Sequence, residues 1–265
     1  FQFIWIPDFE PSVGPEDGSV WWFPGIPPLP AGTRVSKTDQ PSGAFRNHEW
    51  AAQFNMVKHA WDISFIYFYT WDDRPTFFWR GDYFEPQHTR LHQLGGNVDK
   101  NFWLLGRDWA WRMEGLYTLN KYETTLAPGD PDGAVKKNNL LVFSSIETNL
   151  WEGQVFAFLQ PMWRYQFGYD GHLRFLNEKN KMERSELSVI LSLTRQWLDD
   201  QLGFTTTFMY NANQGSWLFQ NTLAWTLSNY LSAQIRYTGF SGSSADLLGM
   251  YDDWDNLGIE LKYNF

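Results

Sequence analysis

The sequence lacks cysteine, long apolar runs and an excess of basic residues. Its 265 residues include no cysteine and carry a formal net charge of -9. The absence of cysteine rules out disulfides and is compatible with an envelope protein. The acidic balance argues against nucleic-acid binding, because nucleic-acid-binding domains carry basic patches. The longest strongly apolar run, Ile63 to Tyr69, is far shorter than the roughly 20 residues that a membrane-spanning helix needs.

The sequence also lacks an initiator methionine and a signal peptide. It opens inside an apolar stretch, Phe1–Ile6. We therefore expect this numbering to begin partway through a longer polypeptide, with N-terminal strands missing.

Aromatic residues are abundant, with 16 Trp, 12 Tyr and 22 Phe, although the mean hydropathy is only -0.44. This combination is typical of a transmembrane β-barrel, whose strands alternate lipid-facing apolar residues with lumen-facing polar ones. A soluble all-β protein, such as a lectin or a carbohydrate-active enzyme, is also rich in tryptophan. Composition alone does not separate the two classes.

The C-terminal segment 256–265 alternates without a break. Leu257, Ile259, Leu261, Tyr263 and Phe265 fall on one face of a strand, and Asn256, Gly258, Glu260, Lys262 and Asn264 fall on the other. A terminal strand that ends on an aromatic residue resembles the closing strand of bacterial outer-membrane barrels. In that class of protein the barrel-insertion machinery reads this strand, so the resemblance implies the machinery as a partner.

The same period-2 alternation recurs along the chain, and helical periodicity is not found. The pattern predicts about twelve strands by the alternation criterion. The expected segments are 1–6, 45–56, 61–70, 88–100, 108–118, 138–150, 154–166, 186–194, 202–211, 217–228, 231–238 and 256–265.

Short and long connections nearly alternate between these segments, which favours a barrel over a soluble sandwich. If the last strand ends in the periplasm, every short turn also lies there. We therefore predict an all-β, antiparallel up-and-down transmembrane barrel of the bacterial outer membrane. Residues 1–265 would form a single barrel domain, part of a barrel of roughly 14 to 18 strands. The short turns are expected near 57–59, 101–106, 151–153, 198–201 and 228–230, and the long links near 7–44 (an outer loop), 71–87, 120–136, 167–183 and 241–254, with 212–215 short where a long link is expected.

Aromatic residues cluster near the predicted strand ends, as the interfacial girdles of a barrel require. We expect them to anchor the barrel in the outer-membrane lipids rather than to stack on a ligand. The candidates are Trp103, Trp151, Trp197 and Phe265 at the periplasmic boundary, and Trp217 and Trp254 at the outer one.

Two stretches resemble a specific family. The first is Ile-Trp-Ile-Pro-Asp-Phe-Glu-Pro at 4–11; the second runs from the Trp-Asp-Ile strand at 61–75, through His-Gln-Leu-Gly-Gly at 92–96, to Arg-Met-Glu-Gly at 112–115. They resemble the Gram-negative outer-membrane family DUF1302, from whose pattern Asp8 and Trp71 depart. The resemblance implies envelope transport of hydrophobic compounds alongside inner-membrane exporters of the resistance-nodulation type. It implies no catalytic residues.

The face opposite the apolar one is the predicted lumen face. Its charges could pair along the barrel wall, or they could form a selective constriction. Several apolar side chains share that face, which suits an internal plug or a hydrophobic passenger. The polar candidates are Glu49, Gln53, Asn55, Arg112, Glu114, Arg164, Gln166, Glu186, Arg236, Glu260 and Lys262, and the apolar ones are Phe156, Phe158, Met162, Ile190 and Leu218.

Metal and catalytic sites are weakly indicated. The acidic tips at 129–133 and 252–255 carry oxygens that Ca²⁺ prefers, but neither has EF-hand spacing. His88 and His92 would lie about 13 Å apart on one strand, too far to share a metal. A lipid hydrolase would need a serine such as Ser64 or Ser144 beside a histidine, and no motif indicates it. We expect no metal, no cofactor and no enzymatic activity.

Three functions remain open. The leading hypothesis is a channel or conduit for hydrophobic or small organic solutes. The second is a structural barrel that sheathes a partner, such as a lipoprotein or a cytochrome. The third is an outer-membrane lipid hydrolase.

Overall fold

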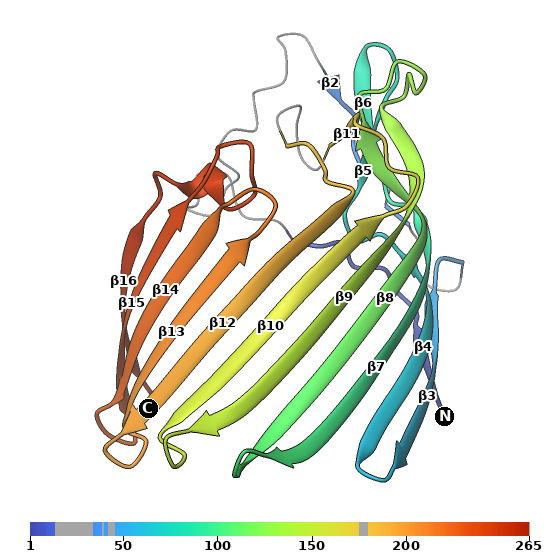
Figure 1. The fold of residues 1–265 in the computed structure, drawn as a ribbon. Helices are drawn as coiled ribbons and strands as arrows, with labels where there is room; N and C mark the ends of the chain where they lie inside the picture. Colours follow the sequence, from blue (N-terminus) through green and yellow to red (C-terminus); the bar gives the residue numbers. More distant parts are fainter. Residues whose placement is uncertain (14–33, 39, 42–45, 175–179, 265) are drawn as a thin grey trace. The chain divides into compact units, whose positions relative to one another are not determined.

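In a computed structural model, the regular elements of the described residues are β-strands apart from one 3-10 turn, and the strands of the main sheet are antiparallel (Figure 1). The structure describes residues 1–13, 34–38, 40–41, 46–174 and 180–264. The strands of the main sheet are β1 (Gln2–Ile6), β3 (Glu49–Lys58), β4 (Trp61–Trp71), β7 (Arg90–Leu104), β8 (Arg107–Thr125), β9 (Ala134–Leu150), β10 (Val155–Gln166), β12 (Ser185–Trp197), β13 (Leu202–Asn211), β14 (Trp217–Thr226), β15 (Leu231–Ser241) and β16 (Asn256–Tyr263).

Each of these strands pairs with the next one along the chain. The hydrogen-bonded order is β1-β3-β4-β7-β8-β9-β10-β12-β13-β14-β15-β16. This order is the up-and-down topology expected from the alternation, and each of the predicted segments corresponds to one of its strands. The prediction of an all-β antiparallel sheet is therefore confirmed. Among the residues that the structure describes, no helix has the length and apolar composition needed to cross a bilayer.

Short strands inside the predicted loops were missed. A three-stranded sheet has the order β2-β6-β5, from β2 (Arg34–Val35), β5 (Thr76–Trp79) and β6 (Tyr83–Gln87). A further strand, β11 (Leu173–Arg174), pairs with the end of β8. These pieces lie in the links predicted as 7–44, 71–87 and 167–183, and they are too short to show alternation. Packing contributes to the stability of β5, because Phe78 is buried and its ring centroid lies 5.1 Å from that of Tyr122 in β8.

Tight two-residue turns join β3 to β4 and β7 to β8. The β3–β4 hairpin closes through His59 and Ala60, and β7 and β8 are joined by Leu105 and Gly106; all four have positive φ. Two successive positive φ values define the type I′ turn, whose twist matches that of paired strands. The first turn was expected near 57–59, but β3 stays paired with β4 through Lys58, so the turn consists of residues 59 and 60.

The link predicted at 120–136 is shorter than expected. Strand β8 continues to Thr125 and β9 begins at Ala134. Asn120 interrupts the alternation of β8 with a φ of 53°, and its N–H donates to Asn138 Oδ1 at 2.8 Å. Residues after Asn120 therefore change faces relative to those before it, which conceals the continuing strand from a simple period-2 reading.

Contacts group the chain into two compact units. Unit 1 comprises 1–98, 114–142 and 164–185, and unit 2 comprises 99–113, 143–163 and 186–265. Each boundary falls inside or at the end of a strand rather than in a link. The assignment of 1–265 to one barrel domain stays a prediction.

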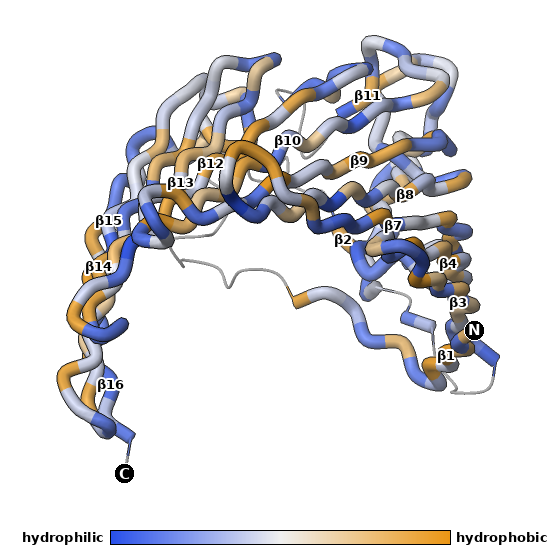
Figure 2. The backbone as a smooth tube through the Cα atoms, turned by 60° about the horizontal axis from the view of Figure 1, so that its bottom comes forward, coloured by the Kyte–Doolittle hydropathy of each residue, from blue (hydrophilic) through white to orange (hydrophobic). Residues whose placement is uncertain are grey.

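Burial within the strands is the reverse of that in a soluble protein. Large apolar strand residues are exposed, such as Phe65 at 60% and Leu191 and Leu223 at 40% each, while Ser64, Thr118, Ser188 and Thr238 are buried. Figure 2 shows hydrophilic and hydrophobic residues alternating along the strands. An apolar face turned outward and a polar face turned inward is the arrangement of a strand between lipid and an aqueous lumen.

This two-faced arrangement predicts that arginine destabilises the fold much more on the apolar face of β14 than on its polar face. Leu223 lies on the apolar face between Phe204 and Ile235, whereas Gln220 lies on the polar face between Thr207 and Thr238. Leu223→Arg is expected to cost about 2–4 kcal/mol because it places a cation in hydrocarbon near mid-depth. Gln220→Arg is expected to change stability by less than about 1 kcal/mol. Denaturant unfolding from lipid vesicles measures both, and equal costs would contradict the assignment of faces.

Candidate functional site

The polar face of β12 to β16 is built from cross-strand rows of side chains. Strand registers place Ser192 beside Thr207, Thr207 beside Gln220 and Gln220 beside Thr238. The Ser192 and Thr207 hydroxyls lie 3.2 Å apart, and Gln220 Nε2 donates to Thr238 Oγ1 at 3.1 Å. A second row, one pleat closer to the tight turns, contains Thr194, Thr205, Thr222 and Arg236.

An apolar row lies on the same face, one pleat further from the tight turns. Ile190 pairs with Met209, Met209 with Leu218, and Leu218 with Phe240. Successive rows are about 7 Å apart, because two residues separate them along each strand. The polar face of unit 2 therefore carries one apolar row beside its polar rows. Of the apolar residues expected on the lumen face, Ile190 and Leu218 belong to this row.

The link between β15 and β16 packs on one end of the apolar row. Its 3-10 turn η1 (Gly249–Tyr251) brings the Tyr251 ring to 5.5 Å from that of Phe240, and Met250 is buried. Asp255 fastens the link to β15, because its carboxylate accepts hydrogen bonds from Phe240 N–H at 2.9 Å and Tyr237 Oη at 3.0 Å. This link covers part of the apolar surface within unit 2.

One carboxyl in this link is easier to protonate than an ordinary aspartate. Burial raises the pKa of Asp246, the hydrogen bond from the Leu247 N–H opposes that shift, and the charge of Glu186 adds to it. Glu186 Oε1 also accepts a hydrogen bond from Asn211 Nδ2 at 2.7 Å. The predicted residue Glu186 therefore lies close to this link.

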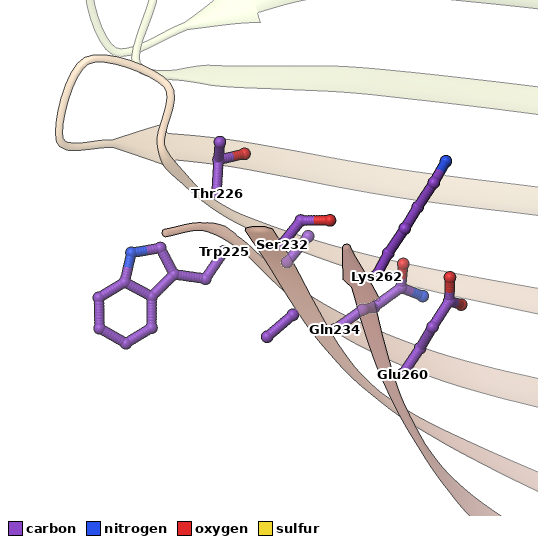
Figure 3. A pocket seen from close by; sticks show the side chains of 8 residues that line it. Trp225, Thr226, Ser232, Gln234, Glu260 and Lys262 are labelled. Atoms are coloured by element: carbon purple, nitrogen blue, oxygen red, sulfur yellow. The ribbon is translucent and has the colours of Figure 1, made fainter. Parts of the chain in front are cut away.

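Two of the predicted charges, Glu260 and Lys262, line a small pocket near the opposite end of the same face (Figure 3). The pocket has a volume of about 90 Å³, and Gln234, Glu260 and Lys262 line it together with Thr226 and Ser232. Register explains the grouping, because Gln234 pairs with Glu260 and Ser232 with Lys262. With its carbonyl oxygen turned toward the guanidinium, Gln234 accepts hydrogen bonds from Arg236 Nη2 at 2.6 Å and Nε at 3.3 Å. In Figure 3 the Trp225 ring points away from these polar groups.

Arg112 forms the centre of an ion-pair cluster on the polar face. Its Nη1 lies 2.7 Å from Glu147 Oε1, and its Nε lies 3.3 Å from Asp99 Oδ1. Sequence reasoning identified Arg112 but not its two partners, because strand pairing decides which residues face one another. The pairs are partly exposed, with exposed side-chain fractions of 47% for Arg112, 31% for Asp99 and 19% for Glu147.

In unit 1, Glu49 is buried, and one of its carboxylate oxygens accepts two hydrogen bonds. Its carboxylate accepts hydrogen bonds from the Thr70 hydroxyl and from the Trp71 N–H, the latter at 2.7 Å. The predicted neighbours Gln53 and Asn55 are joined by a 2.8 Å hydrogen bond from Nε2 to Oδ1. These contacts hold the wall together and leave Glu49 little capacity to bind a solute.

A second charged cluster in unit 1 was only partly foreseen. Lys121 Nζ lies 3.9 Å from Asp72 Oδ2, and both Lys121 and Arg164 act electrostatically on Glu123. The bulge at Asn120 brings Lys121 and Glu123 to the polar face, which the uninterrupted alternation would not place there. Gln166 is almost fully buried and donates to Asn138 O at 3.1 Å. Among the ion pairs of the described residues, Glu114 takes no part.

The candidate girdle residues differ in their placement. The guanidinium carbon of Arg195 lies 5.1 Å from the centroid of the Trp197 ring. The ring centroids of Trp217 and Phe208, on the apolar face, lie 6.2 Å apart. Trp151 sits in a turn with a φ of 48°, and Trp254 follows η1; their exposed fractions are 65% and 40%. Alternation from Asp99 places Trp103 on the polar face of β7, which differs from the expected lipid contact. Phe265 lies outside the described residues.

The residues considered for catalysis and metal binding have other partners. Ser64 Oγ contacts Asn97 Oδ1, and Ser144 Oγ accepts a hydrogen bond from Trp111 Nε1 at 3.0 Å. The Asp130 backbone carbonyl accepts from Gly133 N–H in an ordinary turn. Within the described ranges, no three His, Cys, Asp or Glu side chains converge as metal ligands.

The Arg112 cluster predicts a measurable coupling between strands β8 and β9. Because its members are partly exposed, a double-mutant cycle of Arg112→Gln and Glu147→Gln is expected to give about 0.5–1 kcal/mol. The same cycle with Glu114→Gln in place of Glu147→Gln is expected to give no coupling. Unfolding free energies of the four proteins of each cycle measure it. A coupling near zero for Arg112 and Glu147 would show that the ion pair does not form.

No protein-family model matches the chain, and no curated protein matches it. Among solved structures, the chain is similar to OccAB1 of Acinetobacter baumannii, with a TM-score of 0.51 and 15% sequence identity. The similarity covers 81% of this chain and 56% of the OccAB1 chain, so the chain spans little more than half the length of that protein.

At this level of identity the similarity concerns the fold. OccAB1 is an outer-membrane β-barrel, and this chain has the same fold class: all-β, antiparallel and up-and-down. The total of 14 to 18 strands stays a prediction.

Proposed function

We propose that this chain is part of an outer-membrane channel that conducts small organic solutes bearing both apolar and polar groups. The observation that carries the proposal is the apolar row Ile190, Met209, Leu218 and Phe240 beside hydroxyl and amide rows on the face turned away from lipid. A pore that conducts only polar solutes does not need an apolar row. A solute with an apolar body and polar substituents can use both kinds of surface.

The order of the rows suggests a path along the wall. A solute first contacts Ile190, Met209 and Leu218 of the apolar row, near the long links, and exchanges water for apolar contact there. It then moves over the row of Ser192, Thr207 and Gln220, where hydroxyl and amide groups replace its lost hydrogen bonds to water. Each contact is weak, so a solute can leave as readily as it binds.

The charges near the end of the path favour solutes with a polar head. Arg236, Glu260 and Lys262 present both signs within one small region. Such a region can orient a dipolar or charged group without holding it tightly. In the Arg112 cluster two carboxylates neutralise the guanidinium, so this cluster links neighbouring strands and does not bind the solute.

The location and partners follow from the same proposal. The fold class, the exposed apolar strand faces and the resemblance of residues 1–120 to the DUF1302 family support an outer-membrane protein that takes part in envelope transport of hydrophobic compounds. OccAB1 is itself an outer-membrane channel, which supports the channel role at the level of fold. The proposed partners are outer-membrane lipids, the barrel-insertion machinery and an envelope transport system. No enzymatic activity is proposed.

The apolar row also supports one alternative. It could seat a passenger protein, such as a lipoprotein, in which case the barrel would be a sheath and not a channel. The two functions differ in a single measurement: a sheath purifies with its passenger and conducts no ions across a planar bilayer.

The apolar row predicts a solute-dependent effect of one substitution. In the full-length protein, Ile190→Thr is expected to slow the uptake of apolar organic solutes about fivefold, because losing roughly 1 kcal/mol of apolar contact changes binding by that factor. The uptake of polar solutes of equal size is expected to stay unchanged. Liposome swelling assays with solute pairs of matched size measure the ratio.

Val189→Thr is the matched control, because it makes a similar substitution on the adjacent, lipid-facing residue of β12. It should leave the ratio of the two rates unaltered. If Ile190→Thr and Val189→Thr act alike, the apolar row does not contact the solute, and the proposed path is wrong.

A further inference from the structure

An arginine lies among aromatic side chains on the outward face of unit 1. Arg90, the first residue of β7, has its guanidinium carbon 4.0 Å from the centroid of the Trp71 ring and 4.6 Å from that of Tyr69. Such distances place the cation over two ring faces, where the ring quadrupole attracts it. Sequence reasoning did not single out Arg90.

The aromatic surroundings identify the face as the lipid-facing one. The Tyr69 ring lies 6.2 Å from that of Trp50, and Trp50 stacks on Phe3, which is 68% exposed. His92, two residues beyond Arg90, is bonded to Tyr67 Oη through Nδ1 at 2.6 Å. The opposite face of the same strands carries the buried residues Ser64 and Thr70.

The depth of this site matches the boundary of the apolar layer. Strand β4 runs from Trp61, beside the tight turn, to Trp71. At about 3.3 Å per residue it is about 33 Å long. A tilt of about 40° reduces that to a height of about 25 Å, which is the height of the apolar band of an outer-membrane barrel. Trp71 and Arg90 therefore lie at the level of the lipid headgroups, at the end of the strands away from the tight turns.

Within the described part of the chain, Arg90 donates a single side-chain hydrogen bond. Its Nη1 donates to His48 O at 2.8 Å. Among the residues that the structure describes, Arg90 has no carboxylate within ion-pair distance and no second hydrogen-bond acceptor. The Glu49 carboxylate, which acts on it electrostatically, is already engaged by Thr70 and Trp71. A guanidinium has five N–H donors in a planar fork suited to phosphate.

We propose that Arg90, stacked between Tyr69 and Trp71, binds the phosphate of an outer-leaflet lipid headgroup. A cation at headgroup depth with free donors gains a charge-assisted hydrogen bond from a phosphate. The flanking rings contact the upper acyl chain and the headgroup, as interfacial aromatics do. The occupant is a phosphorylated lipid rather than free phosphate, because the site faces the bilayer and offers one cation within an apolar surround.

The inference rests on the outer-membrane location under the proposed function, and its test separates the two. The full-length protein is purified in detergent and titrated with lipid A, a phosphorylated glycolipid, with dephosphorylated lipid A, and with inorganic phosphate. Binding is followed by the shift in thermal unfolding midpoint. We expect lipid A to bind at least fivefold more tightly than its dephosphorylated form, and inorganic phosphate at millimolar concentration to give no shift.

Arg90→Gln is expected to weaken lipid A binding about fivefold and to leave binding of dephosphorylated lipid A unaltered. Arg90→Lys keeps the charge but loses the planar fork, so its affinity is expected to lie between the two. Arg195→Gln is the matched control, because Arg195 also stacks on an outward-facing tryptophan, Trp197, but lies next to the tight turn at 198–201. It should bind lipid A as the wild type does.

Equal affinities of wild type and both Arg90 variants for lipid A would overturn the proposal, as would equal affinities of wild type for lipid A and its dephosphorylated form. Channel conductance in planar bilayers is measured in parallel. A variant that loses lipid A binding but conducts normally supports the lipid site independently of solute transport. A wild-type protein that inserts but does not conduct, yet binds lipid A through Arg90, would refute the proposed function and leave the phosphate site standing.

Discussion

Backbone hydrogen bonding between neighbouring strands is the constraint on which the rest of this structure depends. In hydrocarbon an unpaired N–H or C=O costs several kcal/mol, so a strand between lipid and water must pair on both sides. The antiparallel order from β1 to β16 provides this pairing for the strands within it. Once the pairing is in place, the pleat sends alternate side chains to opposite faces. Phe65 is exposed and its neighbour Ser64 is buried because the pleat places them on opposite faces of the sheet.

Register also builds the functional surface. Cross-strand neighbours come together because the pairing aligns them, so Ile190, Met209 and Leu218 form one row and Ser192, Thr207 and Gln220 form the next. A shift of one residue would send both rows to the lipid side and bring leucines inward. The same logic gathers Gln234, Glu260 and Lys262 around a pocket. The functional groups of the polar face therefore lie in cross-strand rows and not in a single cluster.

The alternation of apolar and polar residues made the strands of the main sheet predictable. Segments whose position depends on side-chain packing could not be predicted in this way. Strands β5, β6 and β11 are too short to alternate, and Phe78 is placed by contact with Tyr122 rather than by pattern. The bulge at Asn120 depends on a positive φ that asparagine tolerates, and it hid the end of β8. Faces were predictable for Arg112 and Arg236, but partners such as Asp99 and Glu147 were not, because they depend on strand register. Arg90 was missed because its environment is assembled from β4 and β7 together.

The central claim is that one face of these strands contacts hydrocarbon while the other contacts water, and cysteine scanning tests it most directly. The chain contains no cysteine, so single substitutions give a background-free label. Residues 218 to 223 of β14 would be replaced one at a time in the full-length protein in lipid vesicles. The account predicts that a membrane-impermeant thiol reagent modifies positions 218, 220 and 222, and that a lipid-soluble quencher reaches labels at 219, 221 and 223. Uniform labelling, or alternation in the opposite phase, would contradict it.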